Sequence, residues 1–95
     1  MAIEFDPAKS DRNMRERGLP FSKAADFDWD TATTTEDSRS NYGEPRYVAV
    51  GYVEALVHVL VFTPRGEDLR VISFRRANDR EVKAYEHARS VQDGR

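Results

Sequence analysis

The sequence predicts an α+β domain in which a small antiparallel β-sheet carries helices packed on one face. Three observations lead to this prediction. Helix start and stop signals flank residues 7–17, three strand patterns with short connections occupy residues 46–74, and a capping motif opens a last helix near residue 78. At 95 residues, the chain has room for one domain and one modest core. We therefore expect any active site to be an open groove on a face of the sheet.

The first predicted helix covers about residues 7–17, after a short initial strand. Asp6 can cap the free backbone N–H groups, and Pro7 suits the first helical position because an N–H there would be unpaired. Gly18 followed by the apolar Leu19 is a usual end of a helix.

A second, short helix is predicted over residues 20–28, where Phe21 and Ala24 share one face at helical spacing. Residues 31–37 are rich in threonine, which favours a strand. Residues 38–45 form a polar segment and predict a loop.

Three further strands predict an antiparallel meander, because their connections are too short for crossovers. The segments 46–53 and 56–63 are joined by a tight turn at 54–55, and the loop 64–68 leads into the strand 69–74. The segment 56–63 is apolar on both faces apart from its histidine, so it should be the centre of the sheet. The side chains expected to be buried there are Val57, Val59, Val61 and Ile72.

The last helix should begin after Asn78, a good N-cap, with Glu81 three residues later as in a capping box. Val82 and Tyr85 repeat at helical spacing. We expect one domain over residues 1–89 and a flexible tail over residues 90–95.

Composition narrows the classes of function. The chain has no cysteine, which excludes disulfides, zinc–thiolate sites and thiol catalysis. No signal peptide is apparent, and the longest apolar run, residues 55–62, is too short to span a bilayer, so we expect a cytoplasmic protein. The net charge of the chain is −2, but the segment from Arg65 onward contains 8 Lys and Arg residues and only 6 Asp and Glu residues. The C-terminal third is therefore locally basic, and arginine can grip a phosphate with two hydrogen bonds.

Arg75 and Arg76 are the leading candidates for chemistry. They lie where the last strand meets the last helix, and two guanidinium groups there could approach one phosphate from different directions. Strand alternation places Arg70, Ile72 and Phe74 on one face, and Val71, Ser73 and Arg75 on the other. The competing interpretation is a set of solvated charges paired with Asp79 or Glu81.

Two further sites carry groups suited to proton transfer or phosphate binding. In the segment 43–46, Glu44 could act as a general base and Arg46 could stabilise a phosphate, although an ordinary ion pair explains the same residues. His58 could exchange protons near neutral pH, but a lone histidine on an apolar strand is more often a hydrogen-bonded core residue.

No metal or cofactor site is predicted. Asp26, Asp28 and Asp30 alternate, but the glycine turn and the distal glutamate of a calcium loop are missing. The chain also lacks a phosphate-cradling glycine-rich loop and a Gly-x-Ser-x-Gly element.

From about Phe5 to Glu86 the chain resembles the BrnT family of toxins. The resemblance rests on the order and spacing of several markers together. They are Phe5-Asp6-Pro7-Ala8-Lys9 with Asn13; Gly18, Phe21 and Ala24-Ala25; Gly43-Glu44-Pro45-Arg46 with Gly51; Phe62-Thr63 before Arg65-Gly66; and Arg70-Val71-Ile72-Ser73-Phe74-Arg75-Arg76-Ala77 with Glu81 and Tyr85. The family often carries Lys-His-Gly where this chain has Glu16-Arg17-Gly18, so the role of that histidine cannot be transferred.

The resemblance implies a RelE-like fold and a metal-independent ribonuclease that inhibits translation. It also implies a BrnA-like antitoxin with a ribbon-helix-helix domain. The toxin would contact operator DNA only through this antitoxin. On this basis the expected catalytic residues are Arg75, Arg76, Arg46, Glu44 and His58, and the expected RNA-binding residues are Arg70, Arg65 and Lys9. The alternative is a non-catalytic protein-binding module or co-repressor that acts through a DNA-binding partner and uses the same arginines.

Overall fold

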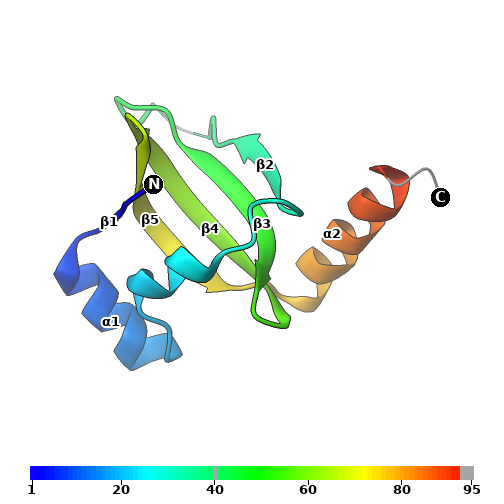
Figure 1. Cartoon of the computed structure of the whole chain (residues 1–95), viewed down its shortest axis with the longest axis horizontal. Helices are drawn as coiled ribbons and strands as arrows, with labels where there is room; N and C mark the ends of the chain where they lie inside the picture. The colour runs from blue at the N-terminus through cyan, green and yellow to red at the C-terminus, as the bar shows by residue number, and fades with distance from the viewer. Residues whose placement is uncertain (40, 93–95) are drawn as a thin grey trace.

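A computed structural model describes residues 1–39 and 41–92 (Figure 1). The elements are β1 (Ile3–Glu4), α1 (Pro7–Arg17), the 3₁₀ helix η1 (Phe21–Asp26), β2 (Thr33–Glu36), β3 (Tyr47–Val53), β4 (Leu56–Arg65), β5 (Asp68–Arg76) and α2 (Asp79–Gln92). This is the order expected from the sequence, and the α+β class is confirmed. The second predicted helix is a 3₁₀ helix instead of an α-helix.

The sheet has five strands in the order β1-β5-β4-β3-β2. The four strands from β2 to β5 form the expected antiparallel meander. The two-residue strand β1 lies parallel to β5 at one edge, where Ile3 pairs with Leu69. The sheet is therefore mixed, because the long crossover through α1 and the meander returns β5 to the side of β1 in the same direction.

The hairpin between β4 and β5 is tighter than the sequence indicated. Pro64 and Arg65 still pair with Leu69 and Asp68, so the connection is a two-residue turn and not the predicted five-residue loop. Gly66 has φ +62°, a conformation that favours glycine and suits two-residue hairpins.

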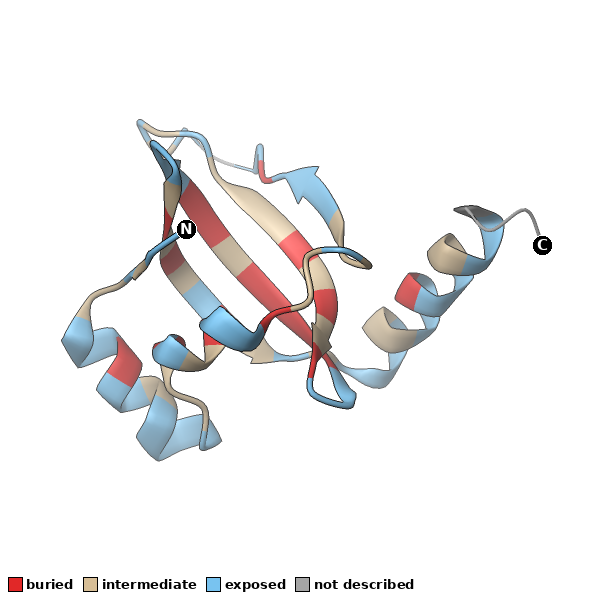
Figure 2. Ribbon diagram, viewed as in Figure 1, coloured by how far each residue is buried: buried red, intermediate tan, exposed pale blue. Residues whose placement is uncertain are grey.

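The core lies on one face of the sheet, beneath α1 and η1 (Figures 1 and 2). Asn13 joins α1 to β5, because its side-chain amide donates to the carbonyls of Leu19 at 2.7 Å and Phe74 at 2.8 Å. The buried apolar cluster comprises Phe21, Ala24, Phe27, Ala49, Val53, Leu60, Phe62, Leu69, Val71 and Phe74.

The caps anticipated from the sequence are present. Gly18 ends α1 in the left-handed conformation at φ +67°. Asn78 Oδ1 accepts a hydrogen bond from the Glu81 N–H at 2.8 Å, and Glu81 Oε1 accepts one from the Asn78 N–H at 2.9 Å, which completes the capping box. The helix α2 continues to Gln92, past the expected start of the tail at residue 90. Residues 93–95 of that tail lie outside the described residues.

The helix α2 contacts the side of the sheet opposite the core. Its Tyr85 packs edge-on against Tyr52 of β3, with ring centroids 5.7 Å apart, and donates a hydrogen bond to the Thr31 carbonyl at 2.7 Å. The expectation that helices pack on one face therefore describes α1 and η1, whereas α2 braces one end of the other face. No helix in the described part of the chain is long and apolar enough to cross a membrane.

Two of the four side chains expected to be buried are only half-buried. Val57 and Val59 are buried as predicted, but Val61 and Ile72 are intermediate. Val61 points to the face that α1 and η1 leave uncovered. Ile72 is the extra residue of a β-bulge, because Val61 pairs with Ser73 while the next residue, Phe62, pairs with Val71.

Candidate active site

The sheet face opposite the core forms a shallow cleft of about 490 Å³. Its floor is apolar and comes from the side chains of Val48, Val50, Val59 and Val61 on β3 and β4. We call the sheet surface on this side, with the side chains that rim it, the open face. The start of α2 closes one end of the cleft, and the segment after β2 closes another. This is the open groove that a domain of this size was expected to offer.

The bulge determines which arginines reach the open face. Strand alternation alone placed Arg70 and Arg75 on opposite faces, but the extra residue at position 72 reverses the alternation between them. Paired residues share a face, and Arg75 pairs with Val59 while Arg70 pairs with Thr63, two residues beyond Val61. Both arginines therefore project from the open face.

Arg75 is held by a two-pronged ion pair at the α2 end of the cleft. Its Nη1 and Nη2 donate to the two Glu81 carboxylate oxygens at 2.7 and 2.8 Å. This hydrogen bonding lowers the pKa of Glu81 to about 2 and raises the pKa of Arg75. The partner suggested by the sequence is thus present, and it occupies the guanidinium edge that a phosphate would use.

At the opposite rim of the cleft, a second carboxylate binds an arginine side chain. The side chain of Asp37 is only 2% exposed and accepts two hydrogen bonds from the Arg39 guanidinium, at 2.8 and 2.9 Å. Hydrogen bonding to Arg39 lowers the pKa of Asp37 to about 2 and raises that of Arg39. The Tyr42 hydroxyl also donates to Asp37, at 3.4 Å.

Glu44 lies between two arginines beside this rim. Its carboxylate oxygens are 3.7 Å from Arg46 Nη2 and 3.6 Å from Arg65 Nη2, which are ion-pair distances longer than hydrogen bonds. The Arg46 guanidinium also stacks 4.0 Å from the centroid of the Tyr42 ring. Glu44 and Arg46 line a hollow of about 370 Å³ that shares residues 36–38 with the valine-floored cleft.

Arg46 is positioned by packing more than by hydrogen bonds. Its side chain is 25% exposed, and its Nε is buried with no hydrogen-bond partner among the described residues. With a ring on one side and a loose carboxylate contact on the other, its terminal N–H groups keep the capacity to bind a phosphate.

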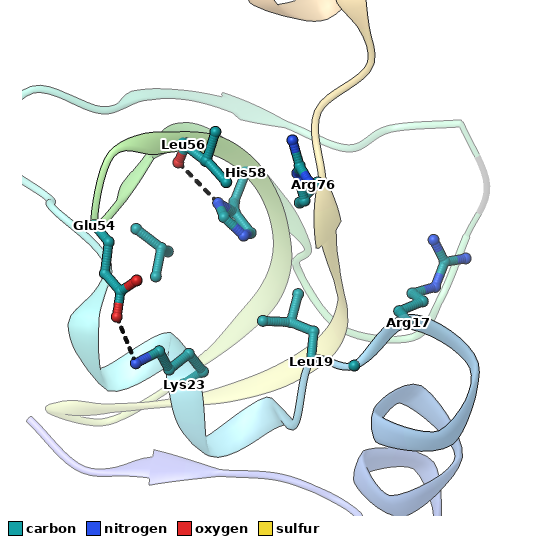
Figure 3. Close-up of a pocket in the computed structure, with 9 residues that line it drawn as sticks. Arg17, Leu19, Lys23, Glu54, Leu56, His58 and Arg76 are labelled. Carbon is teal, nitrogen blue, oxygen red and sulfur yellow. Dashed lines mark hydrogen bonds and ion pairs between the residues drawn. The ribbon is translucent and has the colours of Figure 1, made fainter.

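Three of the residues predicted from the sequence to be catalytic or to bind RNA lie away from the open face. Lys9 is exposed on α1. His58 and Arg76 pair across β4 and β5 and line a separate cleft on the core side, shown in Figure 3. Arg75 and Arg76 thus project from opposite faces of β5, and the structure does not bring them to one phosphate.

Sequence reasoning missed Asp37 and Arg39 as part of this rim. The only local signal is an Asp at the end of a threonine-rich strand, followed two residues later by an Arg. The structure also shows no group of three or more His, Asp or Glu side chains arranged to hold a metal ion within residues 1–39 and 41–92.

A family model described as the ribonuclease toxin BrnT of type II toxin–antitoxin systems matches residues 5–81. The chain belongs to the BrnT family. The match covers most of the chain and ends at Glu81, so it includes every rim residue of the open face described above. No match to a curated protein was found. Membership of the BrnT family makes the protein a ribonuclease toxin, with RNA as substrate and an antitoxin as partner.

Proposed function

We propose that this BrnT protein cleaves RNA on its open face by a metal-independent reaction. The 2′-hydroxyl of the substrate attacks the neighbouring phosphorus, and the bond from phosphorus to the 5′-oxygen breaks. The products are a 2′,3′-cyclic phosphate and a 5′-hydroxyl. The protein must remove the 2′-hydroxyl proton, stabilise the additional negative charge on phosphate, and return a proton to the 5′-oxygen.

The observation that carries this proposal is the carboxylate of Glu44 between the guanidinium groups of Arg46 and Arg65. Glu44 takes the 2′-hydroxyl proton, and its distances of 3.7 and 3.6 Å to the arginines leave their N–H groups available for phosphate oxygens. The proton that Glu44 receives is then available to the leaving 5′-oxygen, so the proton balance closes without a second acid.

Substrate binding extends from this point across the open face. The Tyr42 ring offers a surface on which a base can stack, and the valine floor accepts apolar parts of the nucleotides. Arg70 and Arg75 contact phosphates on either side of the scissile one. For Arg75, a phosphate must replace the carboxylate of Glu81 in the two-pronged contact.

The antitoxin proposed for this toxin is BrnA-like, with a ribbon-helix-helix domain that carries the pair to operator DNA. It blocks the open face by seating apolar side chains on Val48, Val50 and Val61, which are all half-buried in the free toxin. Without the antitoxin, RNA cleavage stops translation, which places the activity in the cytoplasm.

The test is cleavage of a defined oligoribonucleotide by the purified protein in excess EDTA. We expect cleavage to continue, to yield a 2′,3′-cyclic phosphate, and to stop when the scissile nucleotide is 2′-deoxy. Glu44→Gln should slow the reaction by about 10²–10⁴-fold, and the matched control Glu67→Gln, in the β4–β5 turn, should not. Loss of activity in EDTA with recovery on adding Mg²⁺ would refute the metal-independent mechanism, and cleavage of the 2′-deoxy substrate would refute the nucleophile.

A further inference from the structure

A second cleft, on the core side of the sheet, combines positive charge with a buried histidine (Figure 3). It lies between the end of α1, η1 and the β3–β4 turn, and has a volume of about 360 Å³. Three cationic side chains line it against a single carboxylate, and the remaining walls are apolar. The cations are Arg17, Lys23 and Arg76, the carboxylate is Glu54, and the apolar residues are Leu19, Val53 and Leu56.

His58 presents one ring nitrogen to this cleft. The residue is 5% exposed, and its Nδ1 lies 2.8 Å from the carbonyl oxygen of Leu56. A carbonyl oxygen only accepts hydrogen bonds, so Nδ1 must carry a hydrogen and donate it. The other nitrogen, Nε2, forms no hydrogen bond within residues 1–39 and 41–92, although the ring lines the cleft. Arg46 Nε is the one buried polar side-chain atom without a partner among the described residues, so His58 Nε2 is open to the cleft, where a ligand can bond to it.

The charges around the histidine favour an anion. Lys23 is engaged by Glu54 at 2.8 Å and by Asp26 at 3.1 Å, so the single carboxylate of the cleft is already neutralised. In the described part of the chain, neither Arg76 nor Arg17 forms an ion pair with a carboxylate. Figure 3 shows Arg76 beside His58, whereas Arg17 lies at the rim with its side chain directed away.

We propose that this cleft binds the terminal phosphate of a nucleotide. In the tautomer that donates Nδ1–H to Leu56, Nε2 is a hydrogen-bond acceptor, and a phosphate monoester, whose second pKa is near 6, can still carry a P–OH group that donates to it. The P–OH proton therefore supplies the hydrogen bond to Nε2. A phosphodiester cannot carry this proton, which makes the site selective for a strand end or a mononucleotide over an internal RNA linkage.

The rest of the cleft suits the remainder of such a ligand. Arg76 supplies the charge-assisted hydrogen bonds to phosphate, and Leu19, Val53 and Leu56 form an apolar wall for the sugar or base. Because Arg76 and the cleavage residues lie on opposite faces of the sheet, this proposal does not depend on where the protein cleaves RNA.

The experiment follows the ring resonances of His58 by NMR during titration with adenosine 5′-monophosphate, at constant ionic strength. We expect the chemical shifts to saturate as the nucleotide is added. The affinity for the nucleotide should be about tenfold to a hundredfold lower in Arg76→Gln. His58→Asn, which can retain the donor to the Leu56 carbonyl while removing Nε2, should weaken binding measured by calorimetry. Arg80→Gln, an exposed substitution on α2 outside this cleft, is the matched control.

Two additional titrations identify the source of the phosphate. Tighter binding of a 5′-phosphorylated oligoribonucleotide than of the mononucleotide assigns the site to an RNA end, and the reverse order assigns it to a free nucleotide. Either order supports the monoester site. Equal binding of 5′-phosphorylated and 5′-hydroxyl oligoribonucleotides, linear shifts without saturation, or unchanged affinity in Arg76→Gln would overturn it.

Discussion

The substitution Glu81→Gln isolates the ion pair that holds Arg75. Glutamine at this position can still accept the Asn78 N–H, so the capping box is retained while the charge is lost. A fall in the pKa of Glu81 from 4.5 to about 2 corresponds to at most about 3 kcal/mol. The side chains of Arg75 and Glu81 are 34% and 30% exposed, so solvent screening reduces this to about 1–2 kcal/mol.

This stabilisation depends on pH in a defined direction. The pKa of Glu81 is lower in the folded state, so the pair stabilises the protein fully above pH 4.5 and loses its effect as the pH falls towards 2. We expect Glu81→Gln to lower the melting temperature at pH 7, by about 4–8 °C for each kcal/mol. The difference between the two proteins should shrink at pH 3. Asp37, whose pKa is also about 2, is present in both proteins and cancels in the comparison.

The assay is thermal and denaturant unfolding of both proteins from pH 3 to pH 7, together with RNA binding at pH 7. Freed from its carboxylate, Arg75 should bind RNA several-fold more tightly. A stability difference that stays constant down to pH 3 would refute the ion-pair origin of the effect. Weaker RNA binding by Glu81→Gln would contradict the competition between Glu81 and phosphate.

Three other substitutions or measurements test separate parts of the structure. Gly51→Ala should lower the free energy of unfolding by about 1–3 kcal/mol in denaturant melts, because its Cβ would lie 2.9 Å from Phe27 Cζ and 3.0 Å from Ala32 Cβ. An unchanged free energy of unfolding would mean that the sheet relaxes freely at this position. Tyr85→Phe should cost about 1 kcal/mol and increase hydrogen exchange in α2, because it removes the hydrogen bond to Thr31; unchanged exchange would show that packing alone anchors the helix. The antitoxin should compete with RNA for the toxin in equilibrium binding, and a ternary complex with undiminished RNA affinity would exclude a shared open face.

The helix α1 and the capping box of α2 were predictable because their determinants are local. Asp6 accepts a hydrogen bond from the Ala8 N–H two residues away, and the Gly18 N–H bonds to the carbonyl of Met14 at the end of the same helix. Such contacts depend on neighbours in sequence. They can be inferred from residue type and spacing alone.

The face of each arginine on β5 was not predictable, because it depends on the bulge at position 72. One extra residue reverses the alternation, so Arg70 and Arg75 share the open face, and the expected convergence of Arg75 with Arg76 does not occur. Nothing in the composition of the strand marks that position.

The rim of the candidate site was only partly predictable for a related reason. Glu44 and Arg46 could be selected from the sequence because a carboxylate and an arginine lie two residues apart. Arg65 joins them only because the long β4 strand returns beside that loop. The placement of Asp37 likewise depends on pairing between β2 and β3, where the Asp37 N–H donates to the Arg46 carbonyl at 2.8 Å. Contacts between distant segments require the register, which the sequence pattern does not specify.

The most direct test of the open face as the cleavage site is the single-turnover rate of RNA cleavage for Arg46→Ala and Arg76→Ala, with thermal melts for both. Arg46 lies beside Glu44, and losing one such donor to a transition-state phosphate should slow cleavage by about 10²–10³-fold. Arg76 projects from the other face, so with a substrate that has a 5′-hydroxyl end, and therefore no terminal phosphate to bind beside Arg76, its variant should cleave at nearly the rate of the unmodified protein. A large loss of rate in folded Arg76→Ala, with undiminished cleavage by folded Arg46→Ala, would contradict the assignment and move the reaction to the core side of the sheet.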